Sequence, residues 1–117
     1  MIELQDVHKT YDTGTIALNG ISMKIDDGEF VFLVGPSGSG KSTLVNLVPR
    51  FYDVSEGTLL IDGIDVTQLD PDKLRAQIAV VPQKALLFSG TIAENLRWGK
   101  ENASMEELQR AAEMACA

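Results

Sequence analysis

The sequence of 117 residues is short of cysteine, histidine and basic side chains. Its single cysteine, Cys116, excludes an internal disulfide and a zinc site built from cysteines, which fits a reducing compartment. Lys and Arg total 10 against 17 Asp and Glu, for a net charge of -7, so general attraction to nucleic acid or to an anionic membrane surface has no electrostatic basis. Any phosphate that the chain binds must therefore be held locally.

Long hydrophobic runs are also missing. No stretch approaches the roughly 20 apolar residues that a membrane-spanning helix needs, and the longest run, residues 30–34, has the length of a strand. Residues 1–6 lack the basic start and the apolar core of a signal peptide, so we expect a cytoplasmic chain. Hydrophobic residues make up 44% and charged residues 23% of the sequence, which is typical of one folded domain or part of one.

Hydrophobic periodicity predicts an α/β fold whose N-terminal part is antiparallel. Alternating apolar residues and short apolar runs predict strands at residues 2–7, 16–25, 29–34, 58–61 and 78–81. The strand at residues 29–34 is expected to be covered on both faces and to form the centre of the domain, because its apolar run is continuous. Helices are predicted to begin near Lys41, Pro71, Thr91 and Ser104.

A glycine-rich loop carries the strongest chemical signal. Residues 35–42 read Gly-Pro-Ser-Gly-Ser-Gly-Lys-Ser, which satisfies the phosphate-loop pattern G-x-x-x-x-G-K-[ST] between a predicted strand and a predicted helix. Glycines let backbone N–H groups surround a polyphosphate, the lysine reaches the β- and γ-phosphates, and the serine offers a hydroxyl to magnesium. The predicted nucleotide-binding residues are Gly35, Ser37, Gly38, Ser39, Gly40, Lys41, Ser42 and Thr43, with Ser42 also a magnesium ligand.

Phosphoryl transfer also needs a carboxylate that holds magnesium. Leu59-Leu60-Ile61-Asp62 is similar to the apolar strand and aspartate of a Walker B motif, but Gly63 follows where a catalytic glutamate is expected. Asp62-Gly63 is also typical of a turn after a strand, and we favour that interpretation. The single histidine, His8, precedes every motif and is expected to be a surface residue at a strand end.

Beyond the phosphate loop, the sequence resembles the nucleotide-binding domain of an ABC transporter over essentially all of its length. The resemblance implies the ABC type of P-loop ATPase fold, with ATP and Mg2+ as ligands and residues 1–117 as a single partial domain. Tyr11, in a turn between the first two predicted strands, matches the aromatic residue that stacks on adenine in that family. Gln83 matches the Q-loop glutamine that approaches magnesium and the attacking water, which makes it the candidate catalytic residue and a second magnesium ligand.

Residues 84–96 resemble the exporter-type subgroup, in which this segment packs against coupling helices of the transmembrane domains. The resemblance implies partner contacts near Leu87, Phe88 and Trp98, but such aromatic residues also fold back onto their own core, and the sequence leaves both interpretations open. Residues 45–117 as a whole follow the exporter pattern, whereas residues 1–44 look like the cell-division ABC ATPase branch. A mosaic joined at the phosphate-loop helix is therefore a hypothesis.

Several motifs that complete the family's active site do not occur in the sequence: the L-S-G-G-Q signature, the Walker B aspartate with its catalytic glutamate, and the switch histidine. Because two such domains cap each other's ATP, we expect one side of a composite site, with negligible turnover by this chain alone. We also expect a location at the inner membrane face through a transmembrane partner, and self-association through an unpaired strand edge.

Two other functions are open at this point. A truncated or chimeric scaffold that keeps the phosphate loop without catalysis is the first alternative, because the catalytic motifs are missing. A P-loop kinase or GTPase is the second, and the absence of an N-K-x-D guanine-recognition motif argues against it.

Overall fold

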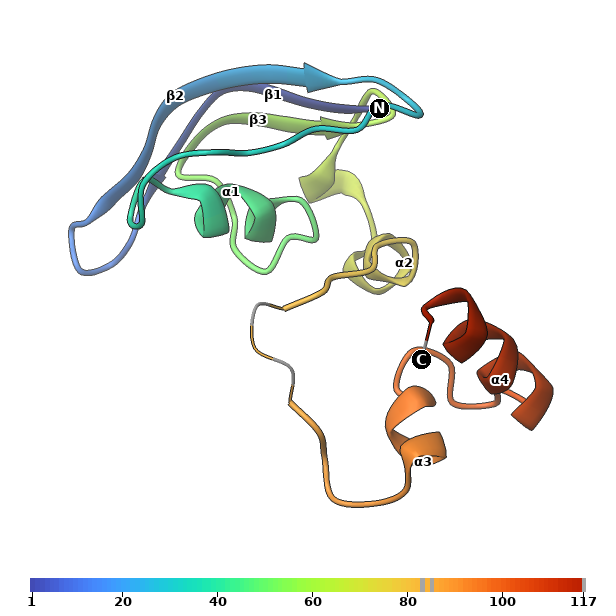
Figure 1. Ribbon diagram of the computed structural model, residues 1–117. Coiled ribbons are helices and arrows are strands. Elements are labelled where there is room, and N and C mark those ends of the chain that lie inside the picture. The colour runs from blue at the N-terminus through green and yellow to red at the C-terminus, as the bar shows by residue number, and fades with distance from the viewer. Residues whose placement is uncertain (83, 85, 117) are drawn as a thin grey trace. The chain divides into compact units, whose positions relative to one another are not determined.

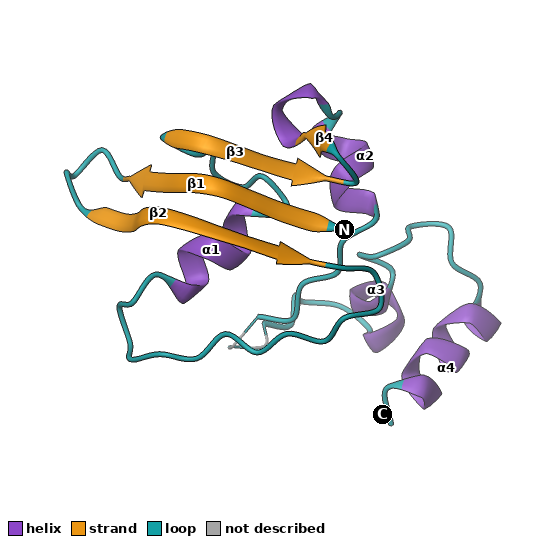
Figure 2. Ribbon diagram, turned by 90° about the horizontal axis from the view of Figure 1, so that it is seen from above, coloured by secondary structure: helices purple, strands orange, loops and turns teal. Residues whose placement is uncertain are grey.

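The structure, a computed structural model, describes residues 1–82, 84 and 86–116. The chain divides into two compact units, Met1–Ala79 and Val80–Ala117. The first unit contains a four-stranded sheet, the helix of the phosphate loop and a further short helix (Figures 1 and 2). The second unit contains a pair of helices. No helix in the described part of the chain is long and apolar enough to cross a membrane.

The sheet of the first unit is antiparallel and has the strand order β2-β1-β3-β4. Its strands are β1 (Ile2–Thr10), β2 (Ile16–Ile25), β3 (Glu56–Ile61) and β4 (Ile64–Asp65). The strands predicted at residues 2–7, 16–25 and 58–61 are confirmed. In β1 the pairing shifts between Leu4 and Val7, and Asp6 adopts a φ of 47°, so this bulge brings both apolar side chains into the core despite their odd spacing.

Helix α1 (Lys41–Leu47) covers one face of this sheet (Figure 1). The core lies between them and consists of Leu4, Val7, Leu18, Leu47, Leu59, Val66 and Leu74. Val66 and Leu74 come from a 3-10 turn (Val66–Gln68) and from helix α2 (Pro71–Ala76). Helix α2 begins with the predicted proline, and the Asp70 side chain caps it by accepting a hydrogen bond from the N–H of Asp72 at 3.0 Å.

The strand predicted at residues 29–34 does not form, and this expectation was wrong. Residues 29–34 run without any strand pairing, and Phe30, Phe32 and Val34 are 83%, 79% and 87% exposed. The strand predicted at residues 78–81 is likewise unpaired, with Val81 93% exposed. An apolar run signals burial but does not supply the partner backbone that a strand needs, and none of the described residues pairs with either segment.

The second unit contains helices α3 (Ile92–Leu96) and α4 (Met105–Met114). Both begin where the sequence predicts, with Thr91 and Ser104 as N-caps of complete capping boxes. In α4 the Ser104 hydroxyl accepts from the N–H of Glu107 at 3.2 Å, and the Glu107 carboxylate accepts from the N–H of Ser104 at 2.9 Å. Among the described residues of this unit, Ala103 and Leu108 are the buried apolar ones.

Candidate functional site

The phosphate-loop residues form an exposed turn that leads directly into α1. A backbone hydrogen bond of 3.2 Å from the N–H of Ser39 to the carbonyl of Pro36 closes the turn. Gly38 and Gly40 have φ values of +82° and +93°, a left-handed conformation that residues with a Cβ rarely adopt. Two positions of the motif therefore require glycine for the path of the backbone, and the loop joins an unpaired segment rather than a strand to its helix.

Position 40 also requires glycine because the loop packs closely against β2 there. A Cβ at Gly40 would lie 2.5 Å from the carbonyl oxygen of Ala17 and 3.0 Å from the side chain of Leu18. A Cβ at Gly38 would meet no atom within 4 Å. The loop is thus open to solvent at Gly38, whereas at Gly40 the absence of a Cβ lets the loop pack directly against β2.

Lys41 reaches back across the loop instead of pointing away from it. Its ammonium donates hydrogen bonds to the carbonyl oxygens of Gly35 at 2.5 Å and Pro36 at 2.8 Å, and lies 3.4 Å from the hydroxyl of Ser39. These acceptors are neutral. A phosphate brings formal negative charge, so an incoming polyphosphate competes well for the same ammonium.

The first turn of α1 presents polar groups next to this ammonium. The first helical hydrogen bond runs from the N–H of Leu44 to the carbonyl of Gly40 at 2.9 Å, and no side chain caps the N-terminus of α1. The N–H groups of Lys41, Ser42 and Thr43 thus precede the hydrogen-bonded ladder of the helix. Ser42 is exposed, and Thr43 is buried with 8% of its surface accessible.

Tyr11 lies beside this helix start, although it comes from the turn between β1 and β2. That turn is confirmed by hydrogen bonds from the N–H of Gly14 to the carbonyl of Tyr11 at 2.8 Å and from the N–H of Tyr11 to the carbonyl of Thr15 at 2.9 Å. The Tyr11 hydroxyl is 2.8 Å from the hydroxyl of Thr43, in a partly buried hydrogen bond. The structure therefore brings the predicted base-stacking residue to the phosphate-loop helix.

Comparison with known proteins decides the family. The family model described as ABC transporter matches residues 18–116. The chain belongs to the ABC transporter family. It is 47% identical to an ATP-dependent lipid A-core flippase of Desulfotalea psychrophila over 114 residues. This alignment covers 97% of this chain and 20% of the flippase. The chain is 45% identical to ATP-binding cassette sub-family B member 6 of Homo sapiens over 114 residues, an alignment that covers 97% of this chain and 14% of that protein.

A solved structure shares the fold. The structure of a bacterial Atm1-family ABC exporter with ATP bound matches 98% of this chain and 20% of its own, with 41% identity and a TM-score of 0.92. The ABC type of P-loop ATPase fold is therefore confirmed. The chain spans at most 20% of the length of these relatives. The separate resemblance of residues 1–44 to the cell-division branch, and the mosaic built on it, stay hypotheses.

Asp62 occupies a turn in this ABC chain. Asp62 and Gly63 connect β3 to β4 with φ values of 50° and +79°, as in a two-residue hairpin turn, and Ile61 pairs with Ile64 across it. The Asp62 carboxylate accepts a hydrogen bond from the backbone nitrogen of Met1 at 2.7 Å. The interpretation of Asp62-Gly63 as a turn is confirmed.

The remaining predicted site residues are less fully placed. Gln83 lies outside the described residues, so its role as catalytic residue and magnesium ligand stays a prediction. Within the described ranges there is no group of three or more His, Cys, Asp or Glu residues that could hold a metal ion. His8 is half-buried within β1 rather than at its end, with its Nε2 3.3 Å from the Asp6 carboxylate.

The exporter-like segment in the second unit shows how Phe88 and Trp98 are held. Their rings lie with centroids 4.8 Å apart, so each aromatic contacts the other. Asn95 of α3 fixes the Phe88 backbone, accepting from its N–H at 2.8 Å and donating to its carbonyl at 3.0 Å. Even so, Leu87, Phe88 and Trp98 remain 86%, 58% and 73% exposed. The two aromatics pack on each other without being buried in this unit.

Sequence reasoning missed Tyr52 and Lys9, which complete the surroundings of Tyr11. The rings of Tyr11 and Tyr52 meet edge to face, with centroids 5.6 Å apart and planes at 88°. The Lys9 ammonium lies 5.5 Å from both centroids. Nothing in the sequence pattern connects these positions, because they come from β1, the following turn and the segment after α1.

Proposed function

We propose that the chain binds MgATP through the loop at residues 35–42, as the nucleotide-binding part of an ABC exporter ATPase. The observation that carries this proposal is the Lys41 ammonium, held over the loop by carbonyl oxygens of that loop, next to the start of α1. Two relatives support it through their printed descriptions, an ATP-dependent flippase and an exporter with ATP bound.

The residues of this chain have distinct parts in that binding. Lys41 exchanges its carbonyl partners for the β- and γ-phosphates, and Gly38 leaves the loop open at its outer side. Ser42 would hold magnesium with its exposed hydroxyl. Magnesium, when bound, neutralises the charge of the phosphate oxygens. Tyr11 stacks on the base.

Thermal unfolding with and without MgATP tests the proposal. A ligand at about 100 times its dissociation constant stabilises the folded state by roughly 2.7 kcal/mol, which corresponds to roughly 10 °C or more for about a hundred residues. We expect such a shift in the parent and none in Lys41→Ala.

Lys73→Ala is the matched control, since it removes the same charge from the exposed face of α2. It should keep the full shift. A parent chain that unfolds at the same temperature with and without millimolar MgATP would refute the proposal. It would favour the non-catalytic scaffold as the alternative.

We further propose that the surface formed by Leu87, Phe88 and Trp98 contacts a transmembrane domain of the exporter. The support is the exposure of three large apolar side chains side by side in sequence or in space, on a backbone fixed by Asn95. Trp98 is the only tryptophan of the chain, so its emission reports directly on this surface. Binding of a peptide with the sequence of a cytoplasmic loop helix should shift the emission to the blue, and unchanged emission at saturating peptide would count against this contact.

A further inference from the structure

The hydroxyl contact of Tyr11 leaves one degree of freedom unfixed. The bond of 2.8 Å to Thr43 anchors the tip of the tyrosine ring to α1. It does not fix the plane of the ring, because the ring can still rotate about the axis from Cβ to the hydroxyl, for which the torsional preference is broad. Stacking on a base depends on that plane. A second contact is therefore needed if Tyr11 is to present a defined face.

We propose that Tyr52 is a positioning residue that fixes the plane of Tyr11 and so strengthens the stacking of the adenine base, an inference that rests on the proposed function. The edge-to-face contact at 88° is the geometry that opposes rotation of the Tyr11 ring. A rotation of Tyr11 about its long axis would break this contact while leaving the hydroxyl bond to Thr43 intact. The two contacts are thus complementary.

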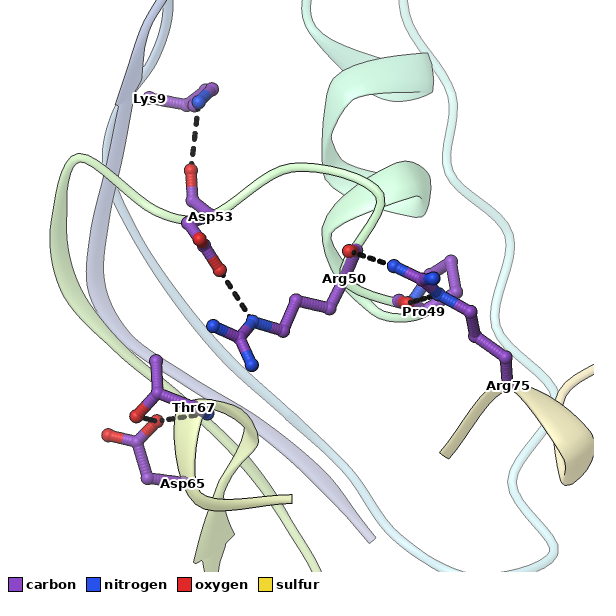
Figure 3. Close-up of polar contacts among 7 residues, drawn as sticks. All are labelled: Lys9, Pro49, Arg50, Asp53, Asp65, Thr67 and Arg75. Atoms are coloured by element: carbon purple, nitrogen blue, oxygen red, sulfur yellow. Dashed lines mark hydrogen bonds and ion pairs between the residues drawn. The ribbon is translucent and has the colours of Figure 1, made fainter. Parts of the chain in front are cut away.

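The segment that carries Tyr52, residues 49–53, is held by three basic side chains, of which Lys9 and Arg75 come from other elements (Figure 3). Lys9 of β1 donates to the carbonyl of Asp53 at 2.8 Å, and Arg50 Nε donates to the Asp53 carboxylate at 2.6 Å. Arg75 of α2 donates to the carbonyls of Pro49 at 3.0 Å and Arg50 at 2.7 Å. These bonds tie residues 49–53 to β1 and α2, so Tyr52 rests on a fixed backbone.

Lys9 joins the two rings as well. Its ammonium is equidistant from the centroids of Tyr11 and Tyr52, and a cation near two aromatic faces attracts both. The same ammonium is bonded to the Asp53 carbonyl, so its position is set by the backbone of the Tyr52 segment. The rings and the ammonium form one cluster.

The exposure of the cluster fits a ligand-facing role. Tyr52 is 45% exposed and Tyr11 is half-buried, while the core of the unit is made of aliphatic residues elsewhere. A pair of aromatic rings that served only to fill the core would be covered. Tyr11 of this pair instead bonds to Thr43, at the start of the phosphate-loop helix.

Binding of ATP and of inorganic tripolyphosphate, measured by calorimetry on the full chain, tests the inference. Tyr52→Leu should weaken ATP binding about three- to tenfold, which is the worth of an aromatic pair. It should leave tripolyphosphate binding unchanged, because that ligand has no base. Tyr52→Phe keeps the ring and should bind both ligands like the parent. In a Tyr11→Ala background, Tyr52→Leu should cause no further loss, because Tyr52 acts only through Tyr11.

The inference would be overturned by ATP binding of Tyr52→Leu equal to that of the parent. It would also be overturned if Tyr52→Leu caused the same loss of ATP binding in the Tyr11→Ala background as in the parent. An equal weakening of ATP and tripolyphosphate would also overturn it, since that marks a general structural effect. If Tyr52→Leu does not unfold cooperatively, Tyr52→Met fills the space with a flexible side chain and decides the question by the same comparison. Failure of the proposed function is distinct, because the parent would then bind neither ligand.

Discussion

Gly40 and Gly38 form a matched pair for testing the account of the phosphate loop. Both have positive φ values, +93° and +82°, so alanine at either position costs about 1–2 kcal/mol for the left-handed backbone. They differ in surroundings, because a Cβ at Gly40 would lie 2.5 Å from the Ala17 carbonyl and a Cβ at Gly38 would meet nothing within 4 Å. Relief of that clash requires β2 to shift, at a cost of about 1–3 kcal/mol typical of overpacking.

We therefore expect Gly38→Ala to lower the free energy of unfolding by about 1–2 kcal/mol and Gly40→Ala by about 2–5 kcal/mol. Urea unfolding of the full chain, monitored by circular dichroism, measures the difference in the free energy of unfolding between the two variants. Equal losses in the two variants, or a greater loss in Gly38→Ala, would refute the reasoning that Gly40 fastens the loop to β2.

Two further predictions concern the second unit. Asn95→Ala removes the hydrogen bonds of 2.8 and 3.0 Å to the Phe88 backbone. It should lower the free energy of unfolding of the second unit by about 1–2 kcal/mol and shift the Trp98 emission to the red. An unchanged emission spectrum would show that Asn95 does not hold the aromatic pair. Glu107 has its pKa lowered, first by Lys100 and then by the N–H of Ser104, so its contribution to the stability of α4 is present above its ordinary pKa and is lost as the pH falls through the lowered value. Helicity followed by circular dichroism should therefore fall less over this acidic window in Glu107→Gln than in the charge-matched control Glu113→Gln, and identical pH profiles would contradict the assignment.

Local chemistry made much of this fold predictable. The caps at Thr91 and Ser104, the proline at the start of α2 and the Asp62-Gly63 turn each depend on a few neighbouring residues. Such features act over one turn of chain, so the sequence alone identifies them. The positive φ values of Gly38 and Gly40 belong to the same class, whereas the close approach of Gly40 to Ala17 depends on a distant part of the chain.

The features that could not be predicted depend on distant partners. The apolar run at residues 30–34 has the composition of a buried strand, but no described residue pairs with it. The contact of Tyr11 with Thr43 and Tyr52 joins positions 32 and more residues apart, and no local pattern encodes it. The role of Lys9 is equally hidden, since its side chain bonds to a carbonyl 44 residues away.

The exposed apolar run at residues 30–34 makes the solubility of the chain depend on its concentration. Phe30 and Phe32 pack edge to face on each other, but both side chains remain largely exposed to water. A short, uncharged, β-prone stretch with free backbone groups is the kind of segment that chaperones retain and that stacks into fibrils when chains are crowded. If the segment pairs with the same segment of a second chain, the step is bimolecular and its rate rises with protein concentration. We therefore expect dilute solutions to keep the chain soluble and concentrated ones to aggregate.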